Sequence, residues 1–92
     1  MRVFPARGRH GRLLRLRYTV NDNSGQTSER ITVLRRTRTV KRFSRPLRPT
    51  ESTIAYWVVW RAGRAGRYRF CIRATDGAGN RSRLACAAIR VR

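Results

Sequence analysis

Two cysteines and one histidine are the side chains of this sequence best suited to covalent or metal chemistry. Cys71 and Cys86 are the only cysteines in 92 residues, and the segment that they enclose, CIRATDGAGNRSRLAC, is rich in glycine and turn-forming residues. A disulfide, a metal site and a reactive thiol are all open to such a pair. Zinc takes closely spaced ligand pairs, whereas this chain has no CxxC and offers only His10 as a third ligand. Because a catalytic thiol also needs a histidine, and His10 lies in the loop-like RGRHGR, we favour a disulfide, with two free thiols as the alternative.

The acidic side chains do not form a catalytic constellation. The chain has four of them, scattered along its length: Asp22, Glu29, Glu51 and Asp76. Proton transfer and acyl transfer need paired groups or a nucleophile with its base, and the sequence supplies neither, nor a glycine-rich phosphate loop. The sequence therefore predicts a protein that is not an enzyme and has no cofactor.

Two turn-like stretches contain a weak candidate for metal binding. Asp22 and Asn23 in NDNSG, with Asp76 and Asn80 in TDGAGN, have the oxygen ligands that calcium prefers. Asp and Asn in turns more often accept hydrogen bonds from their own backbone. We therefore expect no metal and keep Asp22 and Asp76 as weak calcium candidates.

The charge of the chain is its strongest compositional signal. The formal net charge is +19, and of the 23 basic residues all but Lys41 are arginine. Such a charge attracts acidic partners, among them nucleic acid and polyanionic glycans or cell-wall polymers. A high net charge is also typical of disordered chains, but 40% apolar residues in alternating runs argue against disorder here. No run approaches the roughly 18 apolar residues of a membrane span, and MRVFPARGRHG lacks a signal-peptide core, so we expect a soluble piece without a membrane span.

The apolar residues alternate with polar ones in short runs, which is typical of half-buried β-strands. In LLRLRYTV, for example, Leu14, Leu16 and Tyr18 share one face and the arginines between them share the other. Comparable runs are ERITVLRR, TVKRFS, TIAYWVVW, RYRFCIRAT and LACAAIRVR, and a short strand is expected near the N terminus. Two prolines make RPLRPTES a connection rather than a central strand. Residues 1–92 are therefore predicted to form one all-β domain, a seven-stranded antiparallel sandwich.

The last two runs predict their own pairing. If they form a hairpin centred between Ala78 and Gly79, Cys71 faces Cys86 and the apolar residues of both strands fall on one face. The other pairs in this register are Phe70 with Ala87, Ile72 with Ala85 and Tyr68 with Ile89. Direct cross-strand partners are close enough for a disulfide, which stabilises a loop of about fifteen residues by roughly 3 kcal/mol in the chain-entropy model. A disulfide in turn indicates an oxidising, extracellular or cell-envelope location.

The run GRYRFCIRATDGAGNRS resembles the end of bacterial immunoglobulin-like and fibronectin type III-like modules, in which a Gly-x-Tyr strand leads to an Ala-x-Asp-x-x-Gly-Asn turn. LRYTVNDNSG is similar to an early hairpin of such modules in secreted multidomain proteins of high-GC Gram-positive bacteria. The resemblance covers residues 11–91 and implies a noncatalytic spacer, adhesion or carbohydrate-associated role. It also implies that the last hairpin joins strands F and G, and that Tyr68 is a corner tyrosine that bonds the backbone near the preceding turn. The chain departs from the antibody pattern, because its cysteines lie on neighbouring strands.

If successive strands alternate in direction, the connections sort to two ends of the sandwich. NDNSG, RPLRPTES and TDGAGNRS meet at one end with three of the four acids. ARGRHGR, RRTR and RAGRAGR meet at the other end with nine arginines and no acid: Arg7, Arg9, Arg12, Arg35, Arg36, Arg38, Arg61, Arg64 and Arg67. Guanidinium groups pair with phosphate and sulfate, so an anion, if one binds, is predicted to bind at this end. The competing interpretation is a solvated surface or a junction with a neighbouring domain.

One aromatic side chain is predicted on the surface. Regular alternation puts Tyr56 and Trp60 inward and Trp57 outward, as a contact for a sugar or a partner, or capped by arginine stems. Two functions remain: an extracellular immunoglobulin-like module that spaces, adheres or assembles with neighbouring domains or copies of itself, and a basic nucleic-acid-binding all-β protein. A nucleic-acid platform interleaves several exposed aromatics with basic residues. Because Trp57 alone makes a poor platform, we favour the extracellular module.

Overall fold

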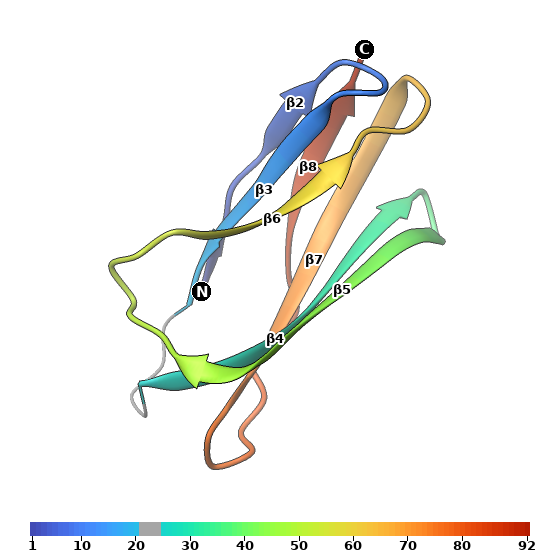
Figure 1. Cartoon of the computed structure of the whole chain (residues 1–92). Coiled ribbons are helices and arrows are strands. Elements are labelled where there is room, and N and C mark those ends of the chain that lie inside the picture. The colour runs from blue at the N-terminus through green and yellow to red at the C-terminus, as the bar shows by residue number, and fades with distance from the viewer. Residues whose placement is uncertain (21–24) are drawn as a thin grey trace.

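The computed structural model describes residues 1–20 and 25–92, which form strands and their connections. Within these residues there are eight strands and no helix (Figure 1). The strands are β1 (Arg2–Val3), β2 (Ala6–Gly8), β3 (Leu13–Thr19), β4 (Gln26–Arg35), β5 (Arg38–Pro49), β6 (Tyr56–Arg61), β7 (Gly66–Asp76) and β8 (Ala85–Val91).

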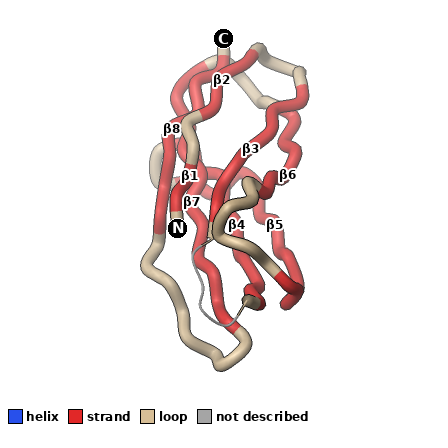
Figure 2. Tube along the Cα trace, turned by 90° about the vertical axis from the view of Figure 1, so that its left-hand side faces the viewer, coloured by secondary structure: helices blue, strands red, loops and turns tan. Residues whose placement is uncertain are grey.

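The strands form two sheets that face each other (Figures 1 and 2). The small sheet has the order β1-β3-β6, and the large sheet has the order β2-β8-β7-β4-β5. Neighbouring strands are antiparallel except β2 and β8, which are parallel. The prediction of an all-β fold with a disulfide is therefore confirmed. The prediction of seven antiparallel strands is wrong, because the described chain has eight strands and its large sheet is mixed.

The additional strand arises because the first expected strand is divided between the two sheets. β1 pairs with β3, whereas β2 pairs with β8. Phe4 still donates its backbone N–H to Arg17 of β3, at 3.0 Å. Pro5, which follows it, has no N–H for a sheet ladder and a fixed φ. The chain leaves the small sheet at this proline and joins the edge of the large one.

The core between the sheets follows the alternation of the sequence. Leu14, Leu16 and Tyr18 of β3 are buried, and the arginines between them are exposed. The large sheet contributes the other half of the core: Ile31, Val33, Tyr68, Phe70, Ile72, Ile89 and Val91. Trp60 of β6 meets Tyr68 of β7 edge-on, with ring centroids 5.0 Å apart. Aromatic pairs favour such a geometry, so this contact helps to join the two sheets.

The C-terminal hairpin has the register that the sequence predicts. Phe70 lies opposite Ala87, and Cys71 lies opposite Cys86. The remaining predicted pairs, Ile72 with Ala85 and Tyr68 with Ile89, are also present. Cys71 and Cys86 form a disulfide on the outward face of β7 and β8, where their Cα atoms are 4.0 Å apart. The requirement to bury the apolar residues therefore also brings the two sulfur atoms together.

β5 differs most from the sequence-based expectation. Only TVKRFS is predicted to be a strand, but β5 continues through Pro46 and ends at Pro49. β5 forms the edge of the large sheet, where a proline deprives no further strand of a hydrogen bond. The pairing with β4 shifts between Thr27 and Glu29, which accommodates the irregular segment. The prediction that this segment is not a central strand is confirmed, and the prediction that it is a connection is wrong for residues 45–49, which belong to β5.

Candidate functional site

The nine arginines predicted to share one end come from three connections and the strands that flank them. Four lie in connections (Arg9, Arg12, Arg36 and Arg64), and five lie in strands (Arg7, Arg35, Arg38, Arg61 and Arg67). In Figure 1 the β2–β3 and β6–β7 connections lie at the top beside the C terminus, and the β4–β5 turn lies below them at the right-hand edge. We call residues 7–12, 35–38 and 61–67 the arginine-loop end. Alternation of strand direction thus places these connections as the sequence predicts.

Backbone and side-chain hydrogen bonds hold two of these connections together. The backbone N–H of Gly11 donates to the Ala62 carbonyl at 2.9 Å, and Arg61 donates from Nη1 to the Gly11 carbonyl at 2.8 Å. His10 Nδ1 lies 2.6 Å from the carbonyl oxygen of Gly63 and donates to it. His10 therefore fastens one turn to another, and its ring is engaged in a structural contact.

Tyr68 links the β6–β7 connection to the β4–β5 turn. Its hydroxyl donates to the Arg64 carbonyl at 2.8 Å, which is the corner-tyrosine contact expected from the sequence. The Arg35 guanidinium lies over the Tyr68 ring, 5.4 Å from the centroid, and Arg35 Nη2 is 3.4 Å from the Ala65 carbonyl. These contacts set the β4–β5 turn beside the β6–β7 connection. Between them is an open cavity of ≈ 780 Å³ whose lining includes Arg35, Arg36, Arg38 and Arg64.

No carboxylate neutralises these arginines within the described residues. The one ion pair there joins Arg48 to Glu29, in the interior of the opposite half of the molecule. Glu51 lies between β5 and β6, and Asp76 ends β7, so both belong to the other end. That other end is mixed, because Arg81 and Arg83 lie in the connection that follows Asp76. The charge polarity that the sequence predicts is therefore present at one end only. Among the described residues, the arginine-loop end has no acidic side chain, whereas the other end has both acidic and basic side chains.

Trp57 points outward from β6, and Trp60 points inward, as the alternation predicts. The Trp57 side chain is 46% exposed, while Trp60 is buried. The Arg15 guanidinium of the neighbouring β3 lies 5.0 Å from the Trp57 ring centroid. One face of this aromatic side chain is thus covered by an arginine, at an energy of about 0.5–1 kcal/mol for an exposed cation–π pair.

Asp76 uses its carboxylate to close its own turn. Oδ1 accepts hydrogen bonds from the backbone N–H groups of Ala78 and Asn80, at 2.9 and 2.8 Å. The bonds from Asn80, backbone first and side chain second, lower the pKa of Asp76. Its calcium-candidate partner Asp22, with Asn23, lies outside the described residues. Among the residues described, no three His, Cys, Asp or Glu side chains gather as a metal site.

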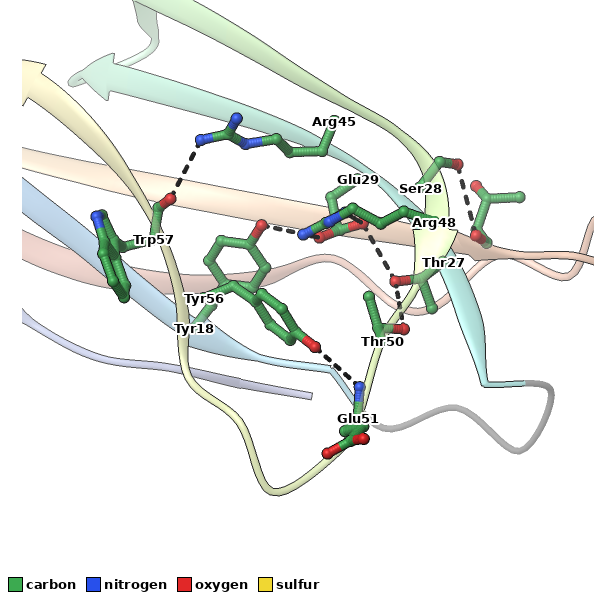
Figure 3. Close-up of polar contacts among 11 residues, drawn as sticks. Tyr18, Thr27, Ser28, Glu29, Arg45, Arg48, Thr50, Glu51, Tyr56 and Trp57 are labelled. Carbon is green, nitrogen blue, oxygen red and sulfur yellow. Dashed lines mark hydrogen bonds and ion pairs between the residues drawn. The ribbon is translucent and has the colours of Figure 1, made fainter.

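A buried polar cluster that the sequence analysis did not identify links the two sheets near the opposite end (Figure 3). Glu29 of β4 is buried, and its carboxylate accepts a bidentate pair of hydrogen bonds from Arg48 of β5, at 2.8 and 2.9 Å. Tyr18 of β3 donates to the same carboxylate at 2.8 Å, and Thr27 donates at 3.2 Å. The alternation Glu29, Ile31, Val33 was a usable signal, because it puts Glu29 on the inward face.

Burial of Tyr18, and secondly its hydrogen bond to Glu29, raise the pKa of its phenol to about 12. The hydrogen bonds to Glu29 also raise the pKa of Arg48. The Arg48 guanidinium lies over the Tyr56 ring, 5.0 Å from the centroid. No buried side-chain nitrogen or oxygen of the described residues lacks a hydrogen-bond partner, and we assign the cluster a structural role.

Comparison with known proteins adds no relative. No protein-family model matches this chain, and no curated protein matches it. In the described part of the chain no helix has the length and apolar character needed to cross a membrane.

The chemistry open to the arginine-loop end is that of fixed, hydrated cations. Arginine presents planar N–H donors that match the oxygens of phosphate, sulfate and carboxylate, and it does not lose its charge at ordinary pH. The strands and the Tyr68 contacts fix the connections that carry these groups, so a bound polyanion would meet a preformed surface.

Proposed function

We propose that this protein is a noncatalytic extracellular immunoglobulin-like module that contacts polyanionic surface polymers through its arginine-loop end. The observation that carries the proposal is the cavity between the β4–β5 turn and the β6–β7 connection. Arg35, Arg36, Arg38 and Arg64 line it, and no acid of the described residues forms an ion pair with them. A sulfated or phosphorylated polymer would supply the missing counter-charge.

The strand order supports the immunoglobulin-like part of the proposal. The sequence β8-β7-β4-β5 in the large sheet corresponds to G-F-C-C′ in an immunoglobulin-type sandwich, and β3-β6 in the small sheet corresponds to B-E. The hydrogen bond from Tyr68 to Arg64 has the character of the tyrosine corner found in that architecture. Such modules commonly act as spacers and adhesion domains, with neighbouring domains or copies of themselves as partners.

The Cys71–Cys86 disulfide supports the extracellular part of the proposal. Structural disulfides persist in oxidising compartments and are rare in the cytosol. In a chain of 92 residues, which buries a comparatively small fraction of its surface, such a link contributes a large share of the stability.

Nucleic-acid binding is the second candidate, and one observation favours it. On the small sheet, Arg2 and Arg17 lie over the Phe4 ring at 5.0 and 5.7 Å from the centroid, and Arg15 lies over Trp57. Aromatic and basic side chains thus alternate on this surface, as in platforms for single strands. The rings already stack on the protein's own guanidinium groups, which would have to move before a base could stack. We therefore place this function second.

Two variants of equal charge test the proposal. Arg36→Gln/Arg38→Gln/Arg64→Gln alters the arginine-loop end, and Arg2→Gln/Arg15→Gln/Arg17→Gln alters the small sheet; each lowers the net charge of +19 by three. We expect the first variant to bind heparin, as a sulfated glycan probe, about tenfold more weakly than the unaltered protein, and the second to bind it nearly normally.

Equal losses in both variants would show that net charge alone governs binding and would contradict the proposal. A stronger loss in the second variant, together with tighter binding of single-stranded DNA than of heparin at the same salt concentration, would support the nucleic-acid alternative.

A further inference from the structure

A second basic site lies on the outer face of the large sheet, away from the arginine-loop end. It is a groove of ≈ 630 Å³ bounded by β4, β7 and the connection between β7 and β8. Six polar side chains contribute to its lining: Ser28, Arg30, Thr32, Arg73, Thr75 and Arg81. Three guanidinium groups and three hydroxyl groups thus border one concave surface. None of the three arginines belongs to the set that the sequence analysis singled out.

The sheet register forces two of these arginines together. Arg30 of β4 and Arg73 of β7 are direct cross-strand partners, and both are exposed on the outer face. Like charges directly opposite each other destabilise a sheet pair. Among the described residues no carboxylate forms an ion pair with either arginine. The pair therefore costs stability unless an anion lies between the two guanidinium groups.

The third arginine is held over the same groove by backbone pairing. Arg81 forms a bridge with Thr75, which lies directly opposite Ser28 of β4. The nearby Asp76 carboxylate forms no ion pair with Arg81, and its Oδ1 accepts hydrogen bonds from the backbone of Ala78 and Asn80. Ser82 fixes the last part of this connection, because its Oγ accepts a hydrogen bond from the Ala74 backbone N–H at 2.9 Å. The connection that carries Arg81 is thus anchored at both Asp76 and Ser82.

The hydroxyl groups supply neutral donors around the charges. Ser28 Oγ lies 3.5 Å from the Thr75 carbonyl, a distance at which a hydrogen bond is weak. The hydroxyl can therefore turn toward a ligand at little cost. Arginine N–H groups combined with hydroxyl donors match the oxygens of a tetrahedral dianion.

From this arrangement we propose that the groove formed by Arg30, Arg73 and Arg81 binds a sulfate or phosphate group, free or carried as an ester on a larger molecule. The group would lie between the guanidinium groups of Arg30 and Arg73, with Arg81 closing the groove from the β7–β8 side. This site shares no residue with the arginine-loop end and does not depend on the function proposed for that end.

The test is a titration of the complete protein with sodium sulfate and, separately, inorganic phosphate, with the ionic strength held constant by sodium chloride. Amide chemical shifts are followed by NMR. We expect saturable shifts at Thr32, Thr75 and Gly79, with an apparent Kd on the order of 1 mM. Arg30→Gln/Arg73→Gln should weaken this binding about tenfold or more. The matched control Arg36→Gln/Arg64→Gln removes the same charge from the arginine-loop end and should leave the groove titration unchanged.

Thermal unfolding provides a second measurement. Sulfate should raise the Tm of the unaltered protein and of the control by mass action, and it should raise the Tm of Arg30→Gln/Arg73→Gln by much less. Exclusion of sulfate from the protein surface would stabilise all three equally. Without sulfate, Arg30→Gln/Arg73→Gln should be at least as stable as the unaltered protein, because it removes a repulsive pair, so a failure to bind cannot be attributed to misfolding.

Three results would overturn the site: shifts that never saturate, shifts confined to the arginine-loop end, or equal Tm gains in all three proteins. A loss of heparin binding at the arginine-loop end with an intact groove titration would contradict the proposed function alone. Binding of a sulfated oligosaccharide but not of the inorganic anions would also overturn the site as proposed, because the groove must then recognise sugar rather than the anionic group.

Discussion

Arg48 meets the buried carboxylate of Glu29 with both of its terminal nitrogens, at 2.8 and 2.9 Å. This bidentate pair joins the edge strand β5 to its neighbour β4, and through Tyr18 it reaches the small sheet. The only ion pair in the described residues is thus a structural link, which leaves the arginines of both proposed binding surfaces without carboxylate partners.

Arg48→Met should destabilise the protein by about 3 kcal/mol, because it leaves the Glu29 carboxylate buried without its cation. Urea unfolding followed by tryptophan fluorescence measures this change in the free energy of unfolding. Arg42→Met, at an exposed position of the same strand, is the control and should change the stability by less than about 0.5 kcal/mol. Equal effects of the two substitutions would show that the Glu29–Arg48 pair does not hold β5.

Tyr18 should titrate at a higher pH than a free tyrosine, because burial and the Glu29 hydrogen bond raise its pKa to about 12. Since the folded state binds this proton more tightly than the unfolded state, the contribution of Tyr18 is fully present below about pH 10 and is lost as the pH rises to about 12. The loss should be about 2–3 kcal/mol in the unaltered protein and absent in Tyr18→Phe. Absorbance at 295 nm and urea unfolding at each pH provide the two measurements. A complete tyrosine titration near pH 10 in the folded protein would refute the expectation.

Removal of the disulfide should cost about 3 kcal/mol, the chain-entropy value for a loop of roughly fifteen residues. Cys71→Ala/Cys86→Ala is the variant, and the free energy of unfolding is compared with that of the oxidised protein. In the native protein, alkylation of the unfolded chain should modify both cysteines only after reduction, and a peptide map should show Cys71 linked to Cys86. Alkylation without reductant would contradict both the disulfide and the proposed extracellular location.

Tyr68→Phe should loosen the arginine-loop end without altering its charge. The substitution removes the hydrogen bond to the Arg64 carbonyl and should cost about 1 kcal/mol of stability. Because the ring still packs on Trp60, the core should stay intact, while hydrogen exchange of the backbone amides in residues 62–67 should accelerate. Unchanged exchange there would mean that the tyrosine hydroxyl does not fix this connection.

The sequence predicted the features that depend on the alternation of apolar and polar residues along a strand. Alternation identified the strands, placed Trp57 outside and Trp60 inside, and aligned Cys71 with Cys86 because burial permits only one register. It did not predict that the first strand divides at Pro5. The chain can cross from the small sheet to the large one only because the edge of β8 is free to pair with β2, and this depends on the fold as a whole. It also underestimated β5, where prolines are tolerated because no further strand pairs with that edge.

Binding surfaces were less accessible to sequence reasoning than the strands were. The arginine-loop end was predictable because turns between alternating strands must lie at common ends. The groove at Arg30 and Arg73 was not predicted, because it depends on the pairing of β4 with β7, two strands separated by β5 and β6 in the chain. The burial of Glu29 could have been predicted, since it lies two residues before Ile31 on the same face of the strand. Its partner could not, because Arg48 meets it only through the pairing of β4 with β5.

The most direct test of the proposed function is an amide-shift map of the protein with a sulfated oligosaccharide at moderate salt concentration. We expect residues 35–38 and 62–67 to show the largest changes apart from those in the groove around Arg73, and the outer face of the small sheet to be unaffected. Changes concentrated around Phe4 and Trp57, or spread evenly over the surface, would contradict the proposed function.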